Sequence, residues 1–236
     1  MEKVAQSGSV SRVSRRSQTA EEHKFPVTEA RPRRRGTQEF IMEQIRSFIA
    51  IELSEDILSA IADLQRRLKN QVPADTVRWV QPNSIHLTLQ FLGDVPAGKI
   101  NPIAQALTAA CVPFSPFTIT VGGLGCFPDP RRPRVTWVGV EEPTGTLAAL
   151  QKAVERAMIP LGFKPEQRAF HPHLTLGRTQ RRATRDQAQA LGTLVSTTQV
   201  PVLGQMEARQ VCLMRSDLRP TGAVYTRLAA APLSGK

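Results

Sequence analysis

Two copies of one tetrapeptide place a histidine and a threonine at the same spacing in two parts of the chain. The copies are His86-Leu87-Thr88-Leu89 and His173-Leu174-Thr175-Leu176, in a sequence with only four histidines. Alternate residues of an extended strand share a face, so each histidine lies on the same face as its threonine and the leucines face the other way. The sequence therefore predicts two half-sites, each presenting an imidazole and a hydroxyl in front of an apolar core.

Two imidazoles and two hydroxyls suit the cleavage of a phosphodiester bond without a metal. In-line attack at phosphorus requires one oxygen to lose a proton while another gains one. Histidine, with an ordinary pKa near 6.5, can supply a neutral base and a protonated acid near neutral pH. The threonine hydroxyls can donate hydrogen bonds to non-bridging phosphate oxygens. A cyclic phosphodiester fits best, because the leaving oxygen stays tethered beside its acid after the ring opens.

Alternating strands and amphipathic helices are expected to position both motifs. A helix, a short loop and a His-Leu-Thr-Leu strand occur in each half, which predicts an α+β fold of two duplicated lobes that face each other. Outside the two motif strands, the first of which should end at 93–94, strands are expected at 45–51, 77–80, 117–124, 135–140, 207–214 and 224–228. Helices are expected at 54–68, with Ser54 as its cap, and at 98–110, 147–161 and 184–194.

The surroundings of both motifs resemble the 2H phosphoesterase superfamily. The segments that carry the resemblance are RWVQPNSIHLTLQFLG (78–93) and FHPHLTLGR (170–178). Within the superfamily the chain is most similar to the RNA 2′,3′-cyclic phosphodiesterases, also called 2′-5′ RNA ligases. The similarity covers about residues 42–228, including 47–53 and 132–139.

The resemblance implies a fold and a reaction. The implied fold has two pseudo-symmetric lobes, each an antiparallel sheet with helices on its outer face, and an active-site cleft between the sheets. The implied reaction is hydrolysis of an RNA terminal 2′,3′-cyclic phosphate to a 2′-phosphate, reversible as 2′-5′ ligation, without metal or cofactor. His86 is then the expected proton donor, His173 the expected proton acceptor, and Thr88 and Thr175 bind the phosphate. Spacing alone leaves the order of the histidines open.

Arg178 completes the pattern His-x-Thr-x-x-Arg and is a candidate phosphate ligand. A regular strand would turn its side chain to the face of Leu174 and Leu176. Only a strand end or a bulge would bring it back beside His173. Phe91 occupies the matching position in the first copy and is expected in the core.

Structural roles compete with functional ones at several positions. A lone histidine beside apolar residues is usually structural, but the duplication and the matched hydroxyl favour a site. His171 and His173 could form a metal pair, yet no cysteine or acid lies near them in sequence, so no metal site is predicted.

Arginine and tryptophan residues near the motifs also leave alternatives open. Arg132 and Arg134 could line an RNA path or belong to a solvated basic loop. Trp79 and Trp137 could stack on bases, although core packing is the stronger expectation.

The charge of the chain favours a polyanionic partner. The net charge is +11, and residues 1–40 hold nine basic and five acidic residues, so the remainder is itself basic. Residues 1–41 are predicted to form a disordered basic N-terminal extension, and 42–236 the phosphoesterase domain with its two lobes. The alternative of a targeting peptide is disfavoured by the acidic residues in this segment.

The remaining expectations concern partners and compartment. The expected partner is an RNA with a 2′,3′-cyclic phosphate end, such as a tRNA fragment. Three cysteines without pairing motifs favour a reducing, cytoplasmic compartment, and no apolar run is long enough for a membrane. We expect a monomer. Two other function classes remain: a non-catalytic protein that binds RNA ends or nucleotides, and a phosphodiesterase acting on a small cyclic nucleotide.

Overall fold

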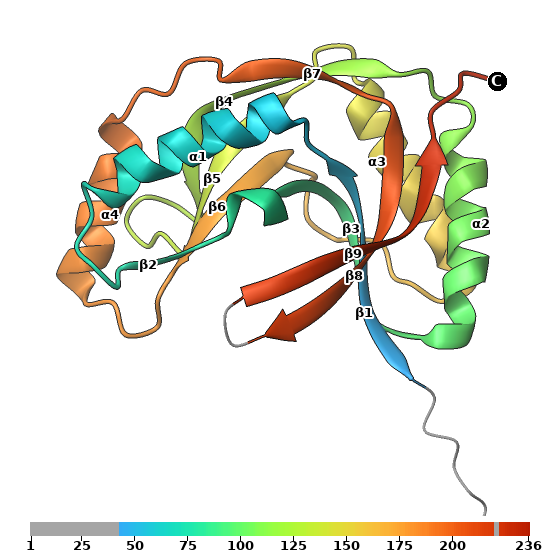
Figure 1. Ribbon diagram of the computed structural model, residues 1–236, viewed down its shortest axis with the longest axis horizontal. Helices are drawn as coiled ribbons and strands as arrows, with labels where there is room; N and C mark the ends of the chain where they lie inside the picture. Colours follow the sequence, from blue (N-terminus) through green and yellow to red (C-terminus); the bar gives the residue numbers. More distant parts are fainter. Residues whose placement is uncertain (1–42, 220–221) are drawn as a thin grey trace, which may run out of the picture. The chain divides into compact units, whose positions relative to one another are not determined.

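Two antiparallel sheets organise the part of the chain that the computed structural model describes, residues 43–219 and 222–236 (Figure 1). The first sheet has the order β3-β1-β8-β9, with bounds β1 (Gln44–Glu52), β3 (His86–Pro96), β8 (Gln210–Arg219) and β9 (Gly222–Pro232). The second has the order β2-β6-β5-β4-β7, with bounds β2 (Val77–Trp79), β4 (Phe117–Phe127), β5 (Val135–Glu141), β6 (His173–Thr179) and β7 (Gly204–Ala208). The predicted extension 1–41 lies outside the described residues.

Four α-helices among the described residues cover the two sheets. Helices α2 (Ile100–Cys111) and α3 (Thr146–Met158) pack on the first sheet, and α1 (Glu55–Lys69) and α4 (Arg185–Thr197) pack on the second. Short 3₁₀ turns lie at Pro82–Ser84, Ala97–Lys99 and Ile159–Leu161. The prediction of an α+β fold with two helix-covered antiparallel sheets is confirmed.

Helix α1 follows from its apolar period and its terminal charges. Ile57, Ile61 and Leu64 are buried on one face, and acidic residues in the first turn and basic ones in the last suit the helix dipole. Ser54 holds the N-cap position, but the expectation that its side chain caps the helix is wrong, because the side chain makes no cap hydrogen bond. Helix α4 does have a capping box, between Thr184 and Gln187.

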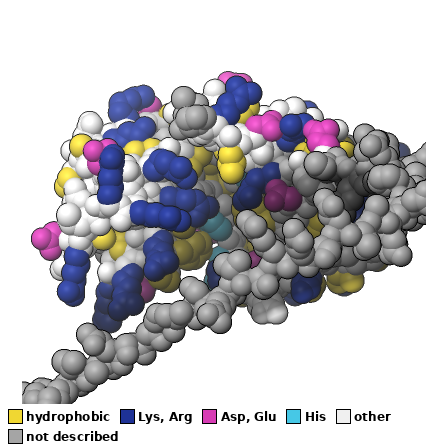
Figure 2. Space-filling model, turned by 90° about the horizontal axis from the view of Figure 1, so that it is seen from below, with side chains coloured by type: hydrophobic (Ala, Val, Ile, Leu, Met, Phe, Trp, Pro, Cys, Tyr) yellow, Lys and Arg dark blue, Asp and Glu magenta, His cyan; other side chains and the backbone are white. Residues whose placement is uncertain are grey.

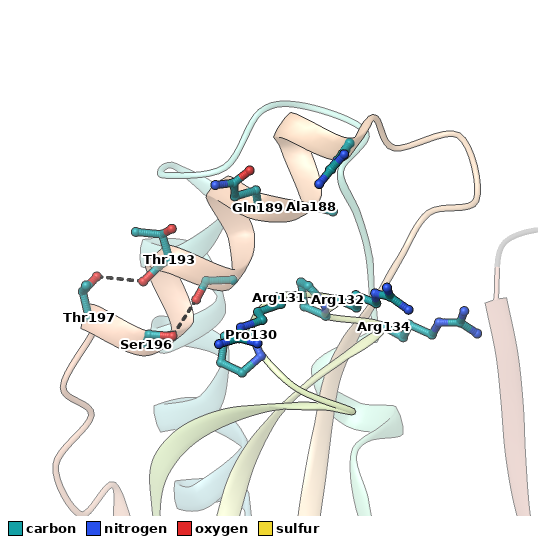
Figure 3. Close-up of a pocket in the computed structure, with 12 residues that line it drawn as sticks. Pro130, Arg131, Arg132, Arg134, Ala188, Gln189, Thr193, Ser196 and Thr197 are labelled. Atoms are coloured by element: carbon teal, nitrogen blue, oxygen red, sulfur yellow. Dashed lines mark hydrogen bonds between the residues drawn. The ribbon is translucent and has the colours of Figure 1, made fainter.

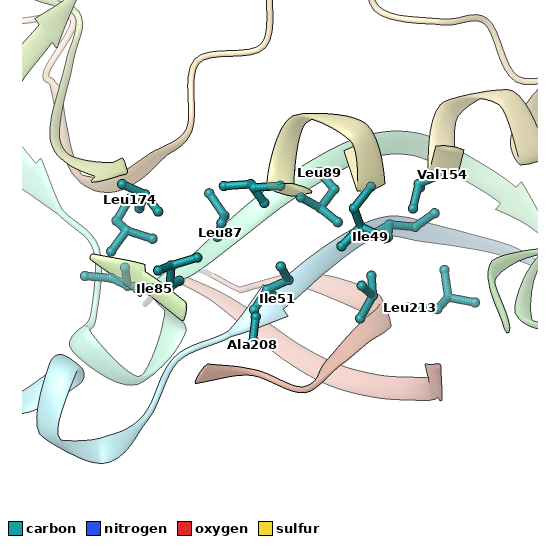
Figure 4. Packing of buried hydrophobic residues seen from close by; sticks show 14 of the residues in the cluster. Ile49, Ile51, Ile85, Leu87, Leu89, Val154, Leu174, Ala208 and Leu213 are labelled. Atoms are coloured by element: carbon teal, nitrogen blue, oxygen red, sulfur yellow. The ribbon is translucent and has the colours of Figure 1, made fainter. Parts of the chain in front are cut away.

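One continuous core holds both motif strands in place (Figure 4). The leucines of the motifs, Leu87, Leu89, Leu174 and Leu176, are all buried in it together with the apolar faces of the helices. Burial of each such side chain away from water stabilises the folded state by about 1.5–3 kcal/mol. The core therefore anchors the strands through one face and leaves the other face for the histidines.

Each lobe mixes elements from both halves of the sequence. Strands β1 and β3 lie in the first sheet, but helix α1 between them packs on the second sheet. Likewise β5 and β6 lie in the second sheet, and α3 between them packs on the first. The duplication is thus interleaved, and neither half of the sequence forms a lobe alone.

Two strand predictions are corrected by the structure. The strand expected at 207–214 is two strands, because the chain leaves the second sheet after Ala208 and enters the first at Gln210. The first motif strand does not end at 93–94 but continues to Pro96. It continues because Leu92 bulges and Gly93, at φ +74°, lets the strand pair again with the start of β1.

No helix within the described ranges is both long and apolar enough to cross a membrane.

Candidate active site

The two motif histidines begin equivalent strands of the two sheets. His86 is the first residue of β3 and His173 the first residue of β6, and both are partly exposed. Figure 2 shows histidine side chains in a recess on one face of the molecule, with lysine and arginine side chains gathered beside them. Thr88 and Thr175 share the histidines' faces, and neither hydroxyl has a hydrogen-bond partner among the described residues. Both hydroxyls are free to bind a ligand.

A backbone carbonyl orients each imidazole in the same way. His86 Nδ1 lies 2.9 Å from the carbonyl oxygen of Ser84, and His173 Nδ1 lies 2.7 Å from that of His171. Because a carbonyl can only accept, each Nδ1 carries the proton of this bond. The Nε2 atom of each ring is therefore the one left for proton transfer, as a base when neutral and an acid when charged.

Aromatic side chains enclose both histidines. Phe48 stacks on His86 with ring centroids 4.5 Å apart, and Tyr225 meets the same ring edge-on at 5.0 Å. Phe127 meets His173 edge-on at 5.0 Å. These rings limit the movement of each imidazole and remove part of its hydration.

The electrostatic surroundings of the two histidines differ. Burial lowers the pKa of His86 below 6.5, while the Ser84 carbonyl and the Glu52 carboxylate oppose that shift. Burial also lowers the pKa of His173, and there the positive charges of Arg178 and His171 lower it further against the effect of the His171 carbonyl. A negative neighbour, Glu52, thus favours the charged form of His86, whereas positive neighbours, Arg178 and His171, disfavour the charged form of His173.

Glu52 is a site residue that the sequence analysis missed. It is the β1 residue paired with His86. Its carboxylate accepts a hydrogen bond from the Cys212 thiol, with Sγ and Oε2 3.3 Å apart, and forms an ion pair with the Arg227 guanidinium at 2.8 Å. Tyr225, the single tyrosine of the chain, was also missed. A single tyrosine in the chain could have marked it as a candidate site residue. However, its strand, β9, is far in sequence from both histidine motifs, so nothing in the sequence linked it to them.

A β-bulge turns Arg178 onto the face of His173. The pairing of β6 with β5 shifts between Thr175 and Gly177, so Leu176 is an extra residue and the alternation changes after it. Arg178 is exposed and acts electrostatically on His173 and also on Tyr225, whose pKa is raised by burial and lowered by this arginine. Because Tyr225 contacts His86, the charge of Arg178 acts on groups of both half-sites.

An equivalent bulge in β3 corrects the prediction for Phe91. The pairing of β3 with β1 shifts between Thr88 and Gln90, so Leu89 is the extra residue. Phe91, expected in the core, is 70 % exposed on the face of His86 and lies 6.2 Å from the ring of Phe48. Phe91 and Arg178 are therefore counterparts in the two half-sites.

Two buried glutamines bind the carbonyl groups of the bulged leucines. Gln65 of α1 donates from Nε2 to the oxygen of Leu176 at 2.8 Å, and Gln151 of α3 donates to that of Leu89 at 3.5 Å. Each glutamine comes from the helix of the opposite sequence half. The bulges are thus supported by the interleaved packing of the two halves.

The other candidates from the sequence occupy peripheral or packing positions. Trp79 packs against the core, as expected, and Lys69 Nζ lies 5.8 Å from its ring centre. Trp137 shares the face of Thr175 and lies 6.3 Å from His173, so it backs the site. His171 is exposed and holds His173 through its carbonyl. Within the described residues no group of three His, Cys, Asp or Glu is placed to hold a metal ion.

Comparison with known proteins identifies relatives over most of the chain. The family model described as LigT like Phosphoesterase matches residues 51–137 and again 138–225. A Methanothermobacter thermautotrophicus protein named RNA 2′,3′-cyclic phosphodiesterase is 38% identical over 184 residues, which are 78% of this chain and 96% of that protein. An Archaeoglobus fulgidus protein of the same name is 33% identical over 78% of this chain and 98% of its own length.

Solved structures show the same similarity. A crystal structure of a Thermus thermophilus protein has a TM-score of 0.66 at 27% identity and covers 81% of this chain and 100% of that one. E. coli LigT complexed with 3′-AMP has a TM-score of 0.64 at 26% identity and covers 81% and 99% of the two chains.

Proposed function

Because the chain belongs to the LigT-like phosphoesterase family, we propose that it hydrolyses the 2′,3′-cyclic phosphate at an RNA end to a 2′-phosphate. The observation that carries this proposal is the matched pair of histidines, each held through Nδ1 by a carbonyl and each presenting Nε2. Relatives named for this reaction, at 38% and 33% identity, support the choice of substrate.

The reaction follows from the difference between the two histidines. The positive charge of Arg178 disfavours the charged form of His173, so His173 acts as the neutral base. Its Nε2 accepts a proton from water as the water oxygen attacks phosphorus. The bond from phosphorus to the 3′-oxygen breaks, and His86 donates its Nε2 proton to that oxygen. The negative charge of Glu52 favours the charged form of His86 that this step needs. With an RNA 5′-hydroxyl in place of water, the same steps form a 2′-5′ linkage.

Three residues hold the charge that develops on the phosphate. Thr88 and Thr175 donate hydroxyl hydrogen bonds to non-bridging oxygens, and Arg178 supplies a positive charge. The absence of other hydrogen-bond partners for the two hydroxyls among the described residues supports this role.

We also propose that residues 42–236 carry out this reaction as a monomer in the cytoplasm. Both histidines come from one chain, so no second copy is needed to complete the site. Cys111, Cys126 and Cys212 are buried and unpaired, which suits a reducing compartment.

The test is incubation of the purified protein with EDTA and an RNA that ends in a 2′,3′-cyclic phosphate, with identification of the product isomer. We expect full activity and a 2′-phosphate, because the histidines supply both proton transfers. A requirement for added divalent metal, or a 3′-phosphate product, would contradict the mechanism. Binding of the RNA without turnover would favour the non-catalytic alternative.

A further inference from the structure

A groove of about 980 Å³ lies between helix α4 and the loop that joins β4 to β5 (Figure 3). Arg131, Arg132 and Arg134 of the loop and Arg185 at the start of α4 line it, and its lining includes no aspartate or glutamate. Four guanidinium groups around one groove make a strongly positive surface.

These four arginines lack partners of opposite charge. All four are exposed, and none forms an ion pair with any residue in the described ranges. Five other arginines do pair with carboxylates, namely Arg66, Arg182, Arg209, Arg215 and Arg227, whereas Arg67 and Arg181, for example, form no ion pair with any residue that the structure describes. Uncompensated like charges repel one another, so a polyanion that neutralises them binds favourably.

The loop that lines the groove has both of its ends beside the catalytic site. The loop leaves β4 after Phe127, which meets the ring of His173 at 5.0 Å. It returns at Arg134, whose carbonyl accepts a hydrogen bond from the backbone of Thr179 at 3.0 Å, next to Arg178. A strand whose terminal phosphate lies at His173 can therefore follow the loop into the groove.

Several contacts fix the loop in this position. The Thr179 hydroxyl donates to the carbonyl of Pro133 at 2.6 Å, and the Arg134 N–H donates to that of Phe127 at 2.7 Å. On the other side Pro130 packs so closely on Gly192 of α4 that a Cβ there would overlap the Pro130 carbonyl. The groove is thus formed before any ligand binds, which lowers the entropic cost of binding.

The helix wall of the groove suits ribose. Ser196 Oγ donates to the carbonyl of Gly192 at 2.9 Å, and Thr197 Oγ1 donates to that of Thr193 at 3.0 Å. Because both hydroxyl hydrogens are used, the oxygens are left as acceptors. The 2′-hydroxyl of RNA is a donor that DNA lacks, so these acceptors favour RNA.

We propose that this groove binds the backbone of the RNA strand several nucleotides upstream of its cyclic end. The inference rests on the proposed function. It makes a polynucleotide, rather than a small cyclic nucleotide, the preferred substrate of the site.

The test compares two double variants that each remove two positive charges. Arg132→Ala/Arg185→Ala removes one arginine from each wall of the groove. Lys152→Ala/Arg156→Ala removes two charges from α3, on the first sheet, and serves as the control. Binding of a single-stranded RNA of about twelve nucleotides with a 3′-hydroxyl end is measured by fluorescence anisotropy over a range of salt concentrations. The same end-labelled sequence is also measured as DNA.

The groove variant should bind this RNA on the order of 10-fold more weakly than the wild type near 0.1 M salt. The slope of log Kd against log salt should fall by about 1.4, because two phosphate contacts are lost. Its KM for the cyclic-phosphate RNA should rise to a similar extent, while its kcat/KM for 2′,3′-cyclic AMP stays that of the wild type.

Unchanged RNA binding by the groove variant, or an equal loss in the α3 control, would overturn the groove proposal. Equal affinity of the wild type for RNA and DNA would overturn the role given to the helix hydroxyls. A wild type that opens neither cyclic substrate would refute the proposed function, and a selective loss of RNA binding would still support the groove.

Discussion

At the scale of residues, the site depends on two identical side chains that must act in opposite ways. Both imidazoles are oriented alike, by a carbonyl at Nδ1, and burial lowers the pKa of both. What distinguishes them is the sign of the neighbouring charge, negative from Glu52 at His86 and positive from Arg178 at His173. Sequence spacing could not show this difference, because Glu52 lies beside His86 only through the pairing of β1 with β3, and Arg178 reaches the face of His173 only through the bulge in β6.

Replacement of Glu52 by glutamine should move one limb of the pH profile. His86 must be charged to act as the acid, so activity falls as pH rises through its pKa. Glu52 raises that pKa, and its loss should shift the alkaline limb of kcat/KM to lower pH while the acid limb stays in place. Glu52→Asp should restore part of the shift. As a control, Glu141→Gln removes an exposed carboxylate from β5 of the second sheet. An alkaline limb that does not move in Glu52→Gln would show that this carboxylate does not tune His86.

At the scale of elements, the bulges decide which side chains enter the site. Period-two alternation correctly placed the histidines and threonines on one face and the leucines on the other. It placed Phe91 wrongly, and it left Arg178 open, because an extra residue reverses the alternation after Leu89 and Leu176. The bulges are supported by helices that lie far away in sequence, so no local pattern encodes them. The exchange of sheets at Arg209 was also missed, because a single residue separates β7 from β8 and no turn residue marks the change.

Replacement of Gln65 by leucine should weaken catalysis through Arg178. The change removes the hydrogen bond to Leu176 at the bulge and should lower the free energy of unfolding by about 1–3 kcal/mol. If Gln65 positions Arg178, kcat/KM should fall in the wild-type background and fall much less in an Arg178→Ala background. Gln151→Leu, which affects the other bulge, is the matched control and should be additive with Arg178→Ala. Additive losses for Gln65 and Arg178 would contradict the positioning role.

At the scale of the whole molecule, the active site exists only because the two sequence halves are interleaved. The duplication was visible in the sequence, but its exchange of helices between the sheets was not, because the motif strands look the same in either arrangement. The two sheets share one continuous core, so the half-sites are held together as a single unit. The basic groove beside them extends this unit toward the rest of an RNA strand.

A chain that starts at Met42 should keep the fold and the turnover of a short substrate. The first strand begins at Gln44, and the core residues described here all follow it. Thermal unfolding and kcat/KM for 2′,3′-cyclic AMP, compared with the full chain, check this expectation. A large loss of stability or activity would show that residues 1–41 contribute to the domain or to the site.

The dependence of kcat/KM on pH, measured for the wild type, His86→Ala and His173→Ala, tests the two-histidine mechanism most directly. The wild-type profile should be bell-shaped, with its optimum below pH 6.5, because burial lowers the pKa of both groups. Each alanine variant should lose activity on the order of 10²–10⁴-fold. His86→Ala should lose the alkaline limb, because the acid is gone, and His173→Ala should lose the acid limb, because the base is gone. A flat wild-type profile between about pH 5 and 9, or near-full activity in either variant with an intact circular dichroism spectrum, would contradict acid–base catalysis by these histidines.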